Sequence, residues 1–303
     1  MKQHYPEVPI GKLCELFGKT RHAWYDNNWR QQDQLLKEEI IVQLVLDIRK
    51  ILPSIGTRKL LHMLHPKLQE HNFQVGRDYL FDVLTQHKLL IRKRKRKIIT
   101  TNSKHWMRKY SNLIEPLQLT RAEQLWVSDI TYIRLSNGFA YLSLVTDAYS
   151  RKVVGFNLHQ DLSSEGCLAA LQMALNTRTN LYLPLIHHSD RGCQYCCKEY
   201  IDLLTKNNIA VSMTTNADPY QNAIAERVNG ILKNEFRLYT SQHGFETTAI
   251  LVQQAIAAYN NMRPHASVDY LTPQKAHEQK GLLKKRWKPY RKQSFANSQI
   301  LPS

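Results

Sequence analysis

The sequence predicts an α/β protein whose mixed sheet is flanked by helices, with a small all-α domain in front of it. Two observations lead to this prediction. Residues 31–91 show helical spacing of apolar residues, whereas strand-like and helix-like segments alternate over residues 119–278. In addition, a chain of 303 residues is long enough for two to three domains.

The composition favours a nucleic-acid partner. The chain carries 42 basic and 25 acidic residues, a net charge of +17. A positive excess of this size is typical of proteins that bind a polyanion. No apolar run reaches the length of about 18 residues that a membrane helix needs, and the N-terminus lacks the apolar core of a signal peptide. We therefore expect a cytoplasmic, nucleoid-associated protein without a membrane partner.

Residues 1–30 form a short helical segment in this prediction. A first apolar face ends at Gly18, and a second short helix begins near Thr20. The pattern fits a remnant helix-turn-helix and fits a plain pair of structural helices equally well.

A clearer helix covers residues 31–52 and is ended by Pro53. Two short amphipathic segments follow, GTRKLLHML and VGRDYLFDVLTQHKLL. Residues 31–91 are therefore predicted to form a helix-turn-helix-like DNA-binding domain. Three cations on its helices fit either phosphate contacts or solvated helix faces: Arg58, Lys59 and Arg77.

Two basic stretches bracket the predicted core. Residues 92–118 are interpreted as a linker along DNA, because self-repulsion among six consecutive cations keeps a chain extended unless an anion covers them. These cations are Arg92, Lys93, Arg94, Lys95, Arg96 and Lys97. Residues 279–303 form a basic tail, in which KKRWKPYRKQ suits backbone contact and stacking on nucleic acid as well as it suits a solvated tail.

The core between them follows the order β-β-β-α-β-α-β-α. Its strands are predicted over residues 125–135, 139–147, 152–159, 185–189 and 209–213, with helices over 163–176, 199–206 and 222–235. A further helix over residues 247–260 packs behind them through Ile250, Leu251, Ala255, Ile256 and Tyr259.

Three carboxylates within this core are candidates for one metal site. Asp129 lies in the middle of a strand, where an acid is unfavourable without a partner such as a divalent cation. Asp190 ends a later strand. On a helical wheel, Glu226 shares a polar stripe with Asn222, Asn229 and Lys233, opposite the helix's own apolar face.

Other candidates are weaker. Asp147 also ends a strand, but a turn-capping role accounts for it. Glu235 falls on the apolar side of its helix. Cys193 and Cys196 form a CxxC, yet no second ligand pair accompanies it, and a structural zinc site normally has four ligands. A metal site made of the three carboxylates is therefore preferred.

Three motifs carry a family resemblance: WVSDITYI, HHSDRGCQY and DPYQNAIAERVNGILKNE, in this order. They resemble the signatures of the DDE transposase and integrase superfamily, and most closely the second-frame (OrfB-type) proteins of the IS3 family of bacterial insertion sequences. The resemblance implies a ribonuclease-H-like, retroviral-integrase-like core. It covers roughly residues 50–278, and Gln221 stands where many relatives have Asp.

By this resemblance Asp129, Asp190 and Glu226 are the metal-binding triad, holding two Mg²⁺ ions, or Mn²⁺. The implied activity is cleavage and joining of double-stranded DNA at element ends by phosphoryl transfer. Lys233, Asn222 and His188 are candidate DNA contacts, although His188 is equally suited to buttress its strand. A homo-oligomer on DNA and a fused first-frame DNA-binding partner are also implied.

Two alternatives remain at this point. A catalytically silent, transposase-derived DNA-binding regulator would be expected to lack a triad carboxylate, and all three are present. A ribonuclease-H-type nuclease would share the fold and the metals. The helix-turn-helix-like front end and the 35 residues between Asp190 and Glu226 favour transposition.

Overall fold

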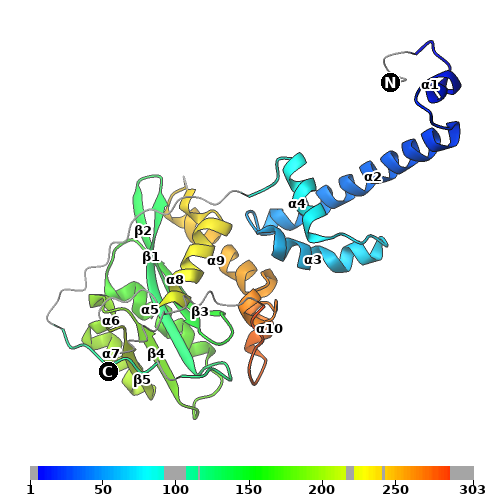
Figure 1. Cartoon of the computed structure of the whole chain (residues 1–303). Helices are drawn as coiled ribbons and strands as arrows, with labels where there is room; N and C mark the ends of the chain where they lie inside the picture. Colours follow the sequence, from blue (N-terminus) through cyan, green and yellow to red (C-terminus); the bar gives the residue numbers. More distant parts are fainter. Residues whose placement is uncertain (1–5, 92–106, 115–116, 216–221, 241–242, 287–303) are drawn as a thin grey trace, which may run out of the picture. The chain divides into compact units, whose positions relative to one another are not determined.

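A computed structural model describes residues 6–91, 107–114, 117–215, 222–240 and 243–286 (Figure 1). The chain divides into two compact units, residues 1–96 and 97–303. Within the described residues, none of the helices combines the length and the apolar character that crossing a membrane requires.

The first unit is all-helical. Its helices are α1 (Ile10–Leu16), α2 (Arg21–Ile51), α3 (Thr57–Glu70) and α4 (Arg77–Gln86). The second half of α2 packs on α3 and α4 through fully buried aliphatic side chains, among them Ile41, Val45, Leu60, Leu64, Leu80 and Leu84. The predicted three-helix arrangement is thus present, and Arg77 pairs with the neighbouring Asp78 at 2.8 Å.

Helix α2 corrects the predicted boundary at residues 30 and 31. The short helix expected near Thr20 and the helix expected from residue 31 are one continuous element of 31 residues. The side chain of Thr20 caps its start by accepting a hydrogen bond from Ala23 N at 3.1 Å. No Gly or Pro interrupts the segment before Pro53, so nothing in its local chemistry ends the helix earlier.

The second unit is built on one five-stranded sheet in the order β3-β2-β1-β4-β5. Its strands are β1 (Leu125–Leu135), β2 (Gly138–Asp147), β3 (Val153–His159), β4 (Leu185–Ser189) and β5 (Ile209–Met213). The first three form an antiparallel meander, and β4 and β5 run parallel to β1. The antiparallel meander and the succession of strands along the chain are those predicted for a ribonuclease-H-like core, and β1 lies at the centre of the sheet.

Helices cover both faces of the sheet. One face carries α5 (Ser164–Thr177), the short α6 (Cys193–Cys196) and α7 (Lys198–Lys206), whose side chains join the main core around Trp126, Leu171 and Tyr200. On the other face, α8 (Ala223–Glu235) contributes Ala225 to a smaller cluster with Leu125 and Val127. The single-turn η1 (Leu238–Thr240) follows α8.

Two expectations for the C-terminal part are corrected. Helix α9 (Phe245–Met262) buries Val252, Ala255, Ile256 and Tyr259, whereas Ile250 is 56% exposed. After η2 (Ala266–Val268) and α10 (Pro273–His277), residues 280–286 were predicted to belong to a separate tail. Instead they are hydrogen-bonded to the second unit at its surface, because Gly281 N donates to Thr120 O at 2.7 Å and Arg286 N donates to Ala266 O at 2.8 Å.

Candidate active site

Asp129 and Asp190 come from neighbouring parallel strands at the same level. In the pairing of β1 with β4, Val127 lies opposite His188. Continuing this register by two residues on each strand brings Asp129 level with Asp190, which directly follows β4. Because adjacent strands lie about 4.8 Å apart and residues two apart share a face, both carboxylates point to the same side of the sheet.

The carboxylate of Asp129 is held at both oxygens. Its Oδ1 accepts a hydrogen bond from Ile130 N at 3.0 Å, and its Oδ2 accepts one from Asn229 Nδ2 at 2.8 Å. Asp190 is held similarly, since its Oδ1 accepts a hydrogen bond from Gly192 N at 3.0 Å. A Cβ at position 192 would lie 3.1 Å from this oxygen, so glycine permits the close turn.

Electrostatics couple the three predicted carboxylates. The pKa of Asp129 is raised to about 7, first by burial and then by the negative charges of Asp190 and, to a smaller extent, Glu226, while the hydrogen bond from Asn229 acts in the opposite direction. When all three carboxylates are ionised, their mutual repulsion and the burial of Asp129 destabilise the folded chain. A bound cation would relieve this repulsion.

The polar stripe of α8, which the helical wheel placed opposite the apolar face of this helix, is partly buried. Asn222 and Asn229 are each only 5% exposed. Asn222 Nδ2 donates to Ser128 O at 3.1 Å, and Asn229 donates to Asp129. These two amides fasten the helix to β1 on either side of Glu226, which is itself exposed in the first turn.

Lys233 lies in the last turn of α8, seven residues after Glu226. Burial lowers the pKa of its amine, and the nearby charge of Asp129 opposes that change. The amine is therefore within electrostatic reach of the carboxylate cluster, which suits the predicted contact with a phosphate next to the reacting bond.

Two predicted DNA contacts are buried in this structure. His188 has no exposed surface, and its Nδ1 is 2.8 Å from Ser212 Oγ between β4 and β5. Of the two roles considered for it, buttressing the strand is the one that fits. The burial of Asn222 likewise makes it a link between α8 and β1 and leaves little of it for DNA to reach.

A buried polar network lies beneath Asp129. His187 Nε2 is 2.8 Å from Ser128 Oγ and 3.0 Å from Tyr200 OH. The pKa of His187 is lowered to about 3, mainly by burial and to a smaller extent by His188, so the imidazole stays neutral at physiological pH. The network ties β1, β4 and α7 together immediately before the position of Asp129.

The rival acids have structural roles. Asp147 is fully buried, and it accepts hydrogen bonds from Glu123 N and from the backbone and hydroxyl of Ser150, each at 2.8 Å. Glu235 forms a two-point ion pair with the guanidinium of Arg263 at 2.7 and 2.8 Å. The predicted turn role of Asp147 is confirmed, and the carboxylate of Glu235 is engaged by Arg263.

The donor set of the cluster suits a hard cation. Asp129, Asp190 and Glu226 supply only carboxylate oxygens, which are the ligands that Mg²⁺ and Mn²⁺ prefer. Within the described parts of the chain, no three His, Cys, Asp or Glu side chains lie close enough together to form a preformed metal cluster.

Sequence reasoning missed Asn229 as the partner of Asp129. It also missed Ser128, whose hydroxyl contacts His187 and whose carbonyl accepts the hydrogen bond from Asn222. The signal for Asn229 was present, because it lies one helical turn after Glu226 on the same stripe. Nothing in the sequence distinguished Ser128. The cations from Arg92 to Lys97, as well as Gln221, lie outside the described residues.

Comparison with known proteins identifies the family of the second unit. The family described as Integrase core domain matches residues 120–219, and a second family of the same description matches residues 207–273. Together these matches span β1 through the start of α10, including all three carboxylates.

Curated relatives extend over nearly the whole chain. The insertion element IS600 31 kDa protein of Shigella sonnei is 30% identical, covering 86% of this chain and 96% of the relative. Transposase InsF for insertion sequence IS3fB of Escherichia coli K12 is 27% identical, with 92% and 97% covered. Among solved structures, a simian T-cell lymphotropic virus intasome chain is 18% identical, covering 78% of this chain and 76% of that chain, with a TM-score of 0.47. The chain belongs to the IS3 family of insertion-sequence transposases, with an integrase core domain.

Proposed function

We propose that this chain cleaves and joins double-stranded DNA at the ends of its insertion sequence by phosphoryl transfer, with Asp129, Asp190 and Glu226 as the catalytic carboxylates. The observation that carries the proposal is the meeting of three elements at one point. Strand β1 presents Asp129, the end of β4 presents Asp190 at the same level, and α8 is fastened to Asp129 by Asn229. Membership of the transposase family makes DNA the expected substrate.

The carboxylates would hold two Mg²⁺ ions, or Mn²⁺ in their place. When bound, such ions activate the attacking water or 3′-hydroxyl and stabilise the departing 3′ oxygen. Asn229 keeps Oδ2 of Asp129 oriented, and the Gly192 amide does the same for Oδ1 of Asp190. No nucleophilic side chain is needed in this chemistry.

Lys233 would bind a DNA phosphate beside the reacting bond. Its amine lies on the same side of α8 as Asn229 and is close enough to influence Asp129. The helical first unit, residues 1–96, and the basic sequence from Arg92 to Lys97 would add contacts with the DNA backbone, because cationic side chains displace counterions from DNA. On DNA, the active form would be a homo-oligomer, with or without a fused first-frame partner.

The test is a plasmid assay with the whole purified chain. Supercoiled DNA carrying the element ends is incubated with Mg²⁺, Mn²⁺ or EDTA, and nicked and joined products are measured. Glu226→Gln should lose at least about a thousandfold in rate, because a metal ligand is lost, and EDTA should abolish cleavage by the wild type.

A matched control is Glu246→Gln, which makes the same change in the first turn of α9, away from the cluster, and should leave the rate unchanged. Cleavage by Glu226→Gln at the wild-type rate would refute the assignment. If no variant cleaves although all bind DNA, repeating the assay with the first-frame fusion distinguishes a regulator from an enzyme that needs its partner.

A further inference from the structure

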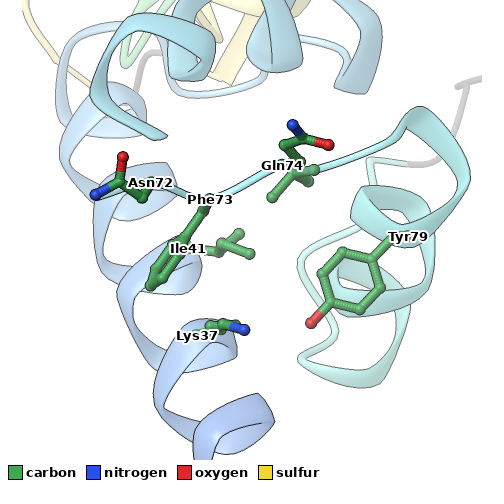
Figure 2. Close-up of a pocket in the computed structure, with 7 residues that line it drawn as sticks. Lys37, Ile41, Asn72, Phe73, Gln74 and Tyr79 are labelled. Atoms are coloured by element: carbon green, nitrogen blue, oxygen red, sulfur yellow. The ribbon is translucent and has the colours of Figure 1, made fainter. Parts of the chain in front are cut away.

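A pocket in the first unit lies between α2 and residues 72–79. Its volume is about 220 Å³, and Figure 2 shows Lys37 and Ile41 projecting from α2 toward Phe73, with Tyr79 on the opposite side. The described residues that line it include no carboxylate, thiol or imidazole. Side chains of this reactive kind are found instead in the second unit, where a group of thiols follows Asp190 in the chain.

Three of the five cysteines lie within five consecutive residues, shortly after Asp190: Cys193, Cys196 and Cys197. All five cysteines lie in the described part of the chain and carry free thiols. Cys193 is exposed, whereas Cys196 is only 8% exposed. A structural zinc site normally has four ligands, and no second ligand pair accompanies this CxxC in the sequence. Chemistry between the two thiols of the CxxC is therefore the function that these residues suit best.

Cys193 and Cys196 are the first and last residues of the single-turn helix α6. Side chains three residues apart on a helix share one face, with their Cβ atoms about 5–6 Å apart. A disulfide joins Cβ atoms that are about 3.5–4.5 Å apart. The two thiols can therefore be joined once this turn tightens by ~1–2 Å. A helix of one turn yields more readily than a longer helix, because no neighbouring turn reinforces its hydrogen bonds.

We infer that Cys193 and Cys196 form a reversible disulfide that disturbs the turn around Asp190. Gly192 connects the two, because its carbonyl accepts hydrogen bonds from Tyr195 N at 3.0 Å and from Cys196 N at 3.3 Å. The amide of Gly192 donates to Asp190 Oδ1 at 3.0 Å. Drawing Cys196 toward Cys193 therefore moves Gly192 and weakens its hydrogen bond to Asp190. An effect on metal binding rests on the proposed function, in which Asp190 is a metal ligand, whereas the disulfide itself does not.

The two thiols differ in the way that this reaction requires. Cys193 is exposed, and as a thiolate it can attack a low-molecular-weight disulfide such as oxidised glutathione, forming a mixed disulfide and releasing one thiol. Cys196 then gives up its proton to solvent and attacks the sulfur of Cys193, which releases the second thiol. Both protein thiols are thereby oxidised, and the reagent disulfide is reduced to two thiols. Burial, followed by the charge of Asp190, raises the pKa of Cys196 to about 11, so this thiol does not start the exchange.

Other thiols are less suitable partners for Cys193. The Sγ of Cys197 donates a hydrogen bond to Gln194 O at 3.2 Å, and burial raises the pKa of this thiol. Cys167 is only 1% exposed, and burial raises its pKa to about 12. Cys196 is therefore the partner that we expect.

Thiol mapping of the whole chain after incubation with oxidised glutathione tests the pairing. The tryptic peptide of residues 192–198 contains all three neighbouring thiols, and in the wild type it should lose two of them and regain them on reduction. Cys197→Ser is the matched control and should still form the disulfide. Cys196→Ser should stop at a glutathione adduct on Cys193, and Cys193→Ser should give neither product. Three free thiols in the treated wild type would overturn the inference, as would an internal disulfide in Cys196→Ser but not in Cys197→Ser.

Amide hydrogen exchange measures the turn without any metal. The Gly192 amide should exchange faster in the oxidised chain, because its hydrogen bond to Asp190 is weakened. Cys193→Ser, treated in the same way, should exchange at the rate of the reduced wild type. Circular dichroism verifies that each variant keeps its helix content. An oxidised chain that contains the disulfide but shows an unchanged rate at Gly192 would overturn the effect on the turn.

Magnesium binding, followed by thermal unfolding, tests the connection with the proposed site. Oxidation should raise the dissociation constant of Mg²⁺ at least about tenfold, as the loss of a hydrogen bond to a metal ligand does. By reciprocity, Mg²⁺ should shift the thiol–disulfide equilibrium toward the free thiols by the same factor. Equal affinity of the two forms for Mg²⁺ would overturn the connection with Asp190. If Mg²⁺ does not stabilise even the reduced chain, the proposed metal site fails, while thiol mapping and exchange at Gly192 still decide on the disulfide and its effect on the turn.

Discussion

At Asp129, burial and neighbouring charge act in the same direction on one carboxylate. The folded chain raises the pKa of Asp129 from 3.8 to about 7, with burial as the largest cause and Asp190 next. A mid-strand acid is therefore costly for folding when no cation is bound. The hydrogen bond from Asn229 reduces this cost without removing it.

This shift predicts that the metal-free chain loses stability as pH rises. A raised pKa means that the folded state binds the proton more tightly than the unfolded state. The stabilisation is therefore complete below pH 3.8 and is lost as pH rises through about 7. Relative to Asp129→Asn, the wild type should lose on the order of 3 kcal/mol between pH 4 and pH 8, as measured by urea unfolding at each pH.

His187 makes the comparison with a variant necessary. Its pKa is lowered to about 3, so its contribution is present above pH 6.5 and is lost as pH falls. The two residues thus have opposite pH dependences, and only the difference between the wild type and Asp129→Asn isolates Asp129. Adding Mg²⁺ should stabilise the wild type more at pH 8 than at pH 5 and should leave Asp129→Asn nearly unaffected. A pH-independent difference would contradict the raised pKa of Asp129.

At the scale of elements, the contact of α5 with the sheet depends on one glycine. A Cβ on Gly155 in β3 would lie 2.0 Å from Ala170 O in α5. Because a backbone carbonyl cannot yield as a flexible side chain does, Gly155→Ala should force the helix away from the strand. We expect a loss of at least about 3 kcal/mol in the free energy of unfolding.

Gly230 provides the matched control for this substitution. It lies inside α8, and no atom is within 4 Å of the position that its Cβ would take. Gly230→Ala should therefore stabilise the chain by ~0.5–1 kcal/mol, as alanine does in a helix interior. Denaturant unfolding of both variants measures the two effects. Equal effects at the two positions would show that the close packing of α5 on β3 does not limit stability.

Strands were predicted more accurately than helix faces. The bounds of β1 and β5 follow from the sequence, because runs of β-branched and aromatic residues between polar turns define both ends of a strand. Apolar periodicity placed α9 but misassigned Ile250, since a helix that packs on one side leaves the edge of its apolar stripe exposed. Asn229 is the opposite case, a polar residue that is buried, because strand β1 supplies its hydrogen-bond partner, Asp129.

From the sequence, the candidate site could be predicted only as a set of carboxylates. Asp129, Asp190 and Glu226 were selected by motif order and spacing, which do not depend on knowing the packing, and their catalytic role stays a prediction. Asn222 and His188 were candidate DNA contacts, with buttressing of the strand as the alternative for His188, and both are buried. Local sequence indicates which residues are chemically suitable, whereas the pairing of β1 with β4 and α8 decides which of them reach the surface.

On the scale of the whole molecule, the two compact units have separate cores. Residues 1–96 pack around the aliphatic side chains of α2, α3 and α4, and residues 97–303 pack around the sheet. Residues that share one core unfold together in a single cooperative transition. Two separate cores therefore predict two separate transitions. Calorimetry of the whole chain should therefore show two transitions, and Mg²⁺ should raise only that of the larger unit.

Two core substitutions assign these transitions. Leu64 in α3 and Leu171 in α5 are both fully buried, and truncation of either to alanine should cost ~2–5 kcal/mol. Each kcal/mol lowers Tm by about 4–8 °C in a domain of 60–100 residues but by about 2–4 °C in one of 150–250 residues. Leu64→Ala should therefore shift its transition about twice as far as Leu171→Ala shifts the other. If both variants shift one common transition, the two units unfold together although their cores are separate.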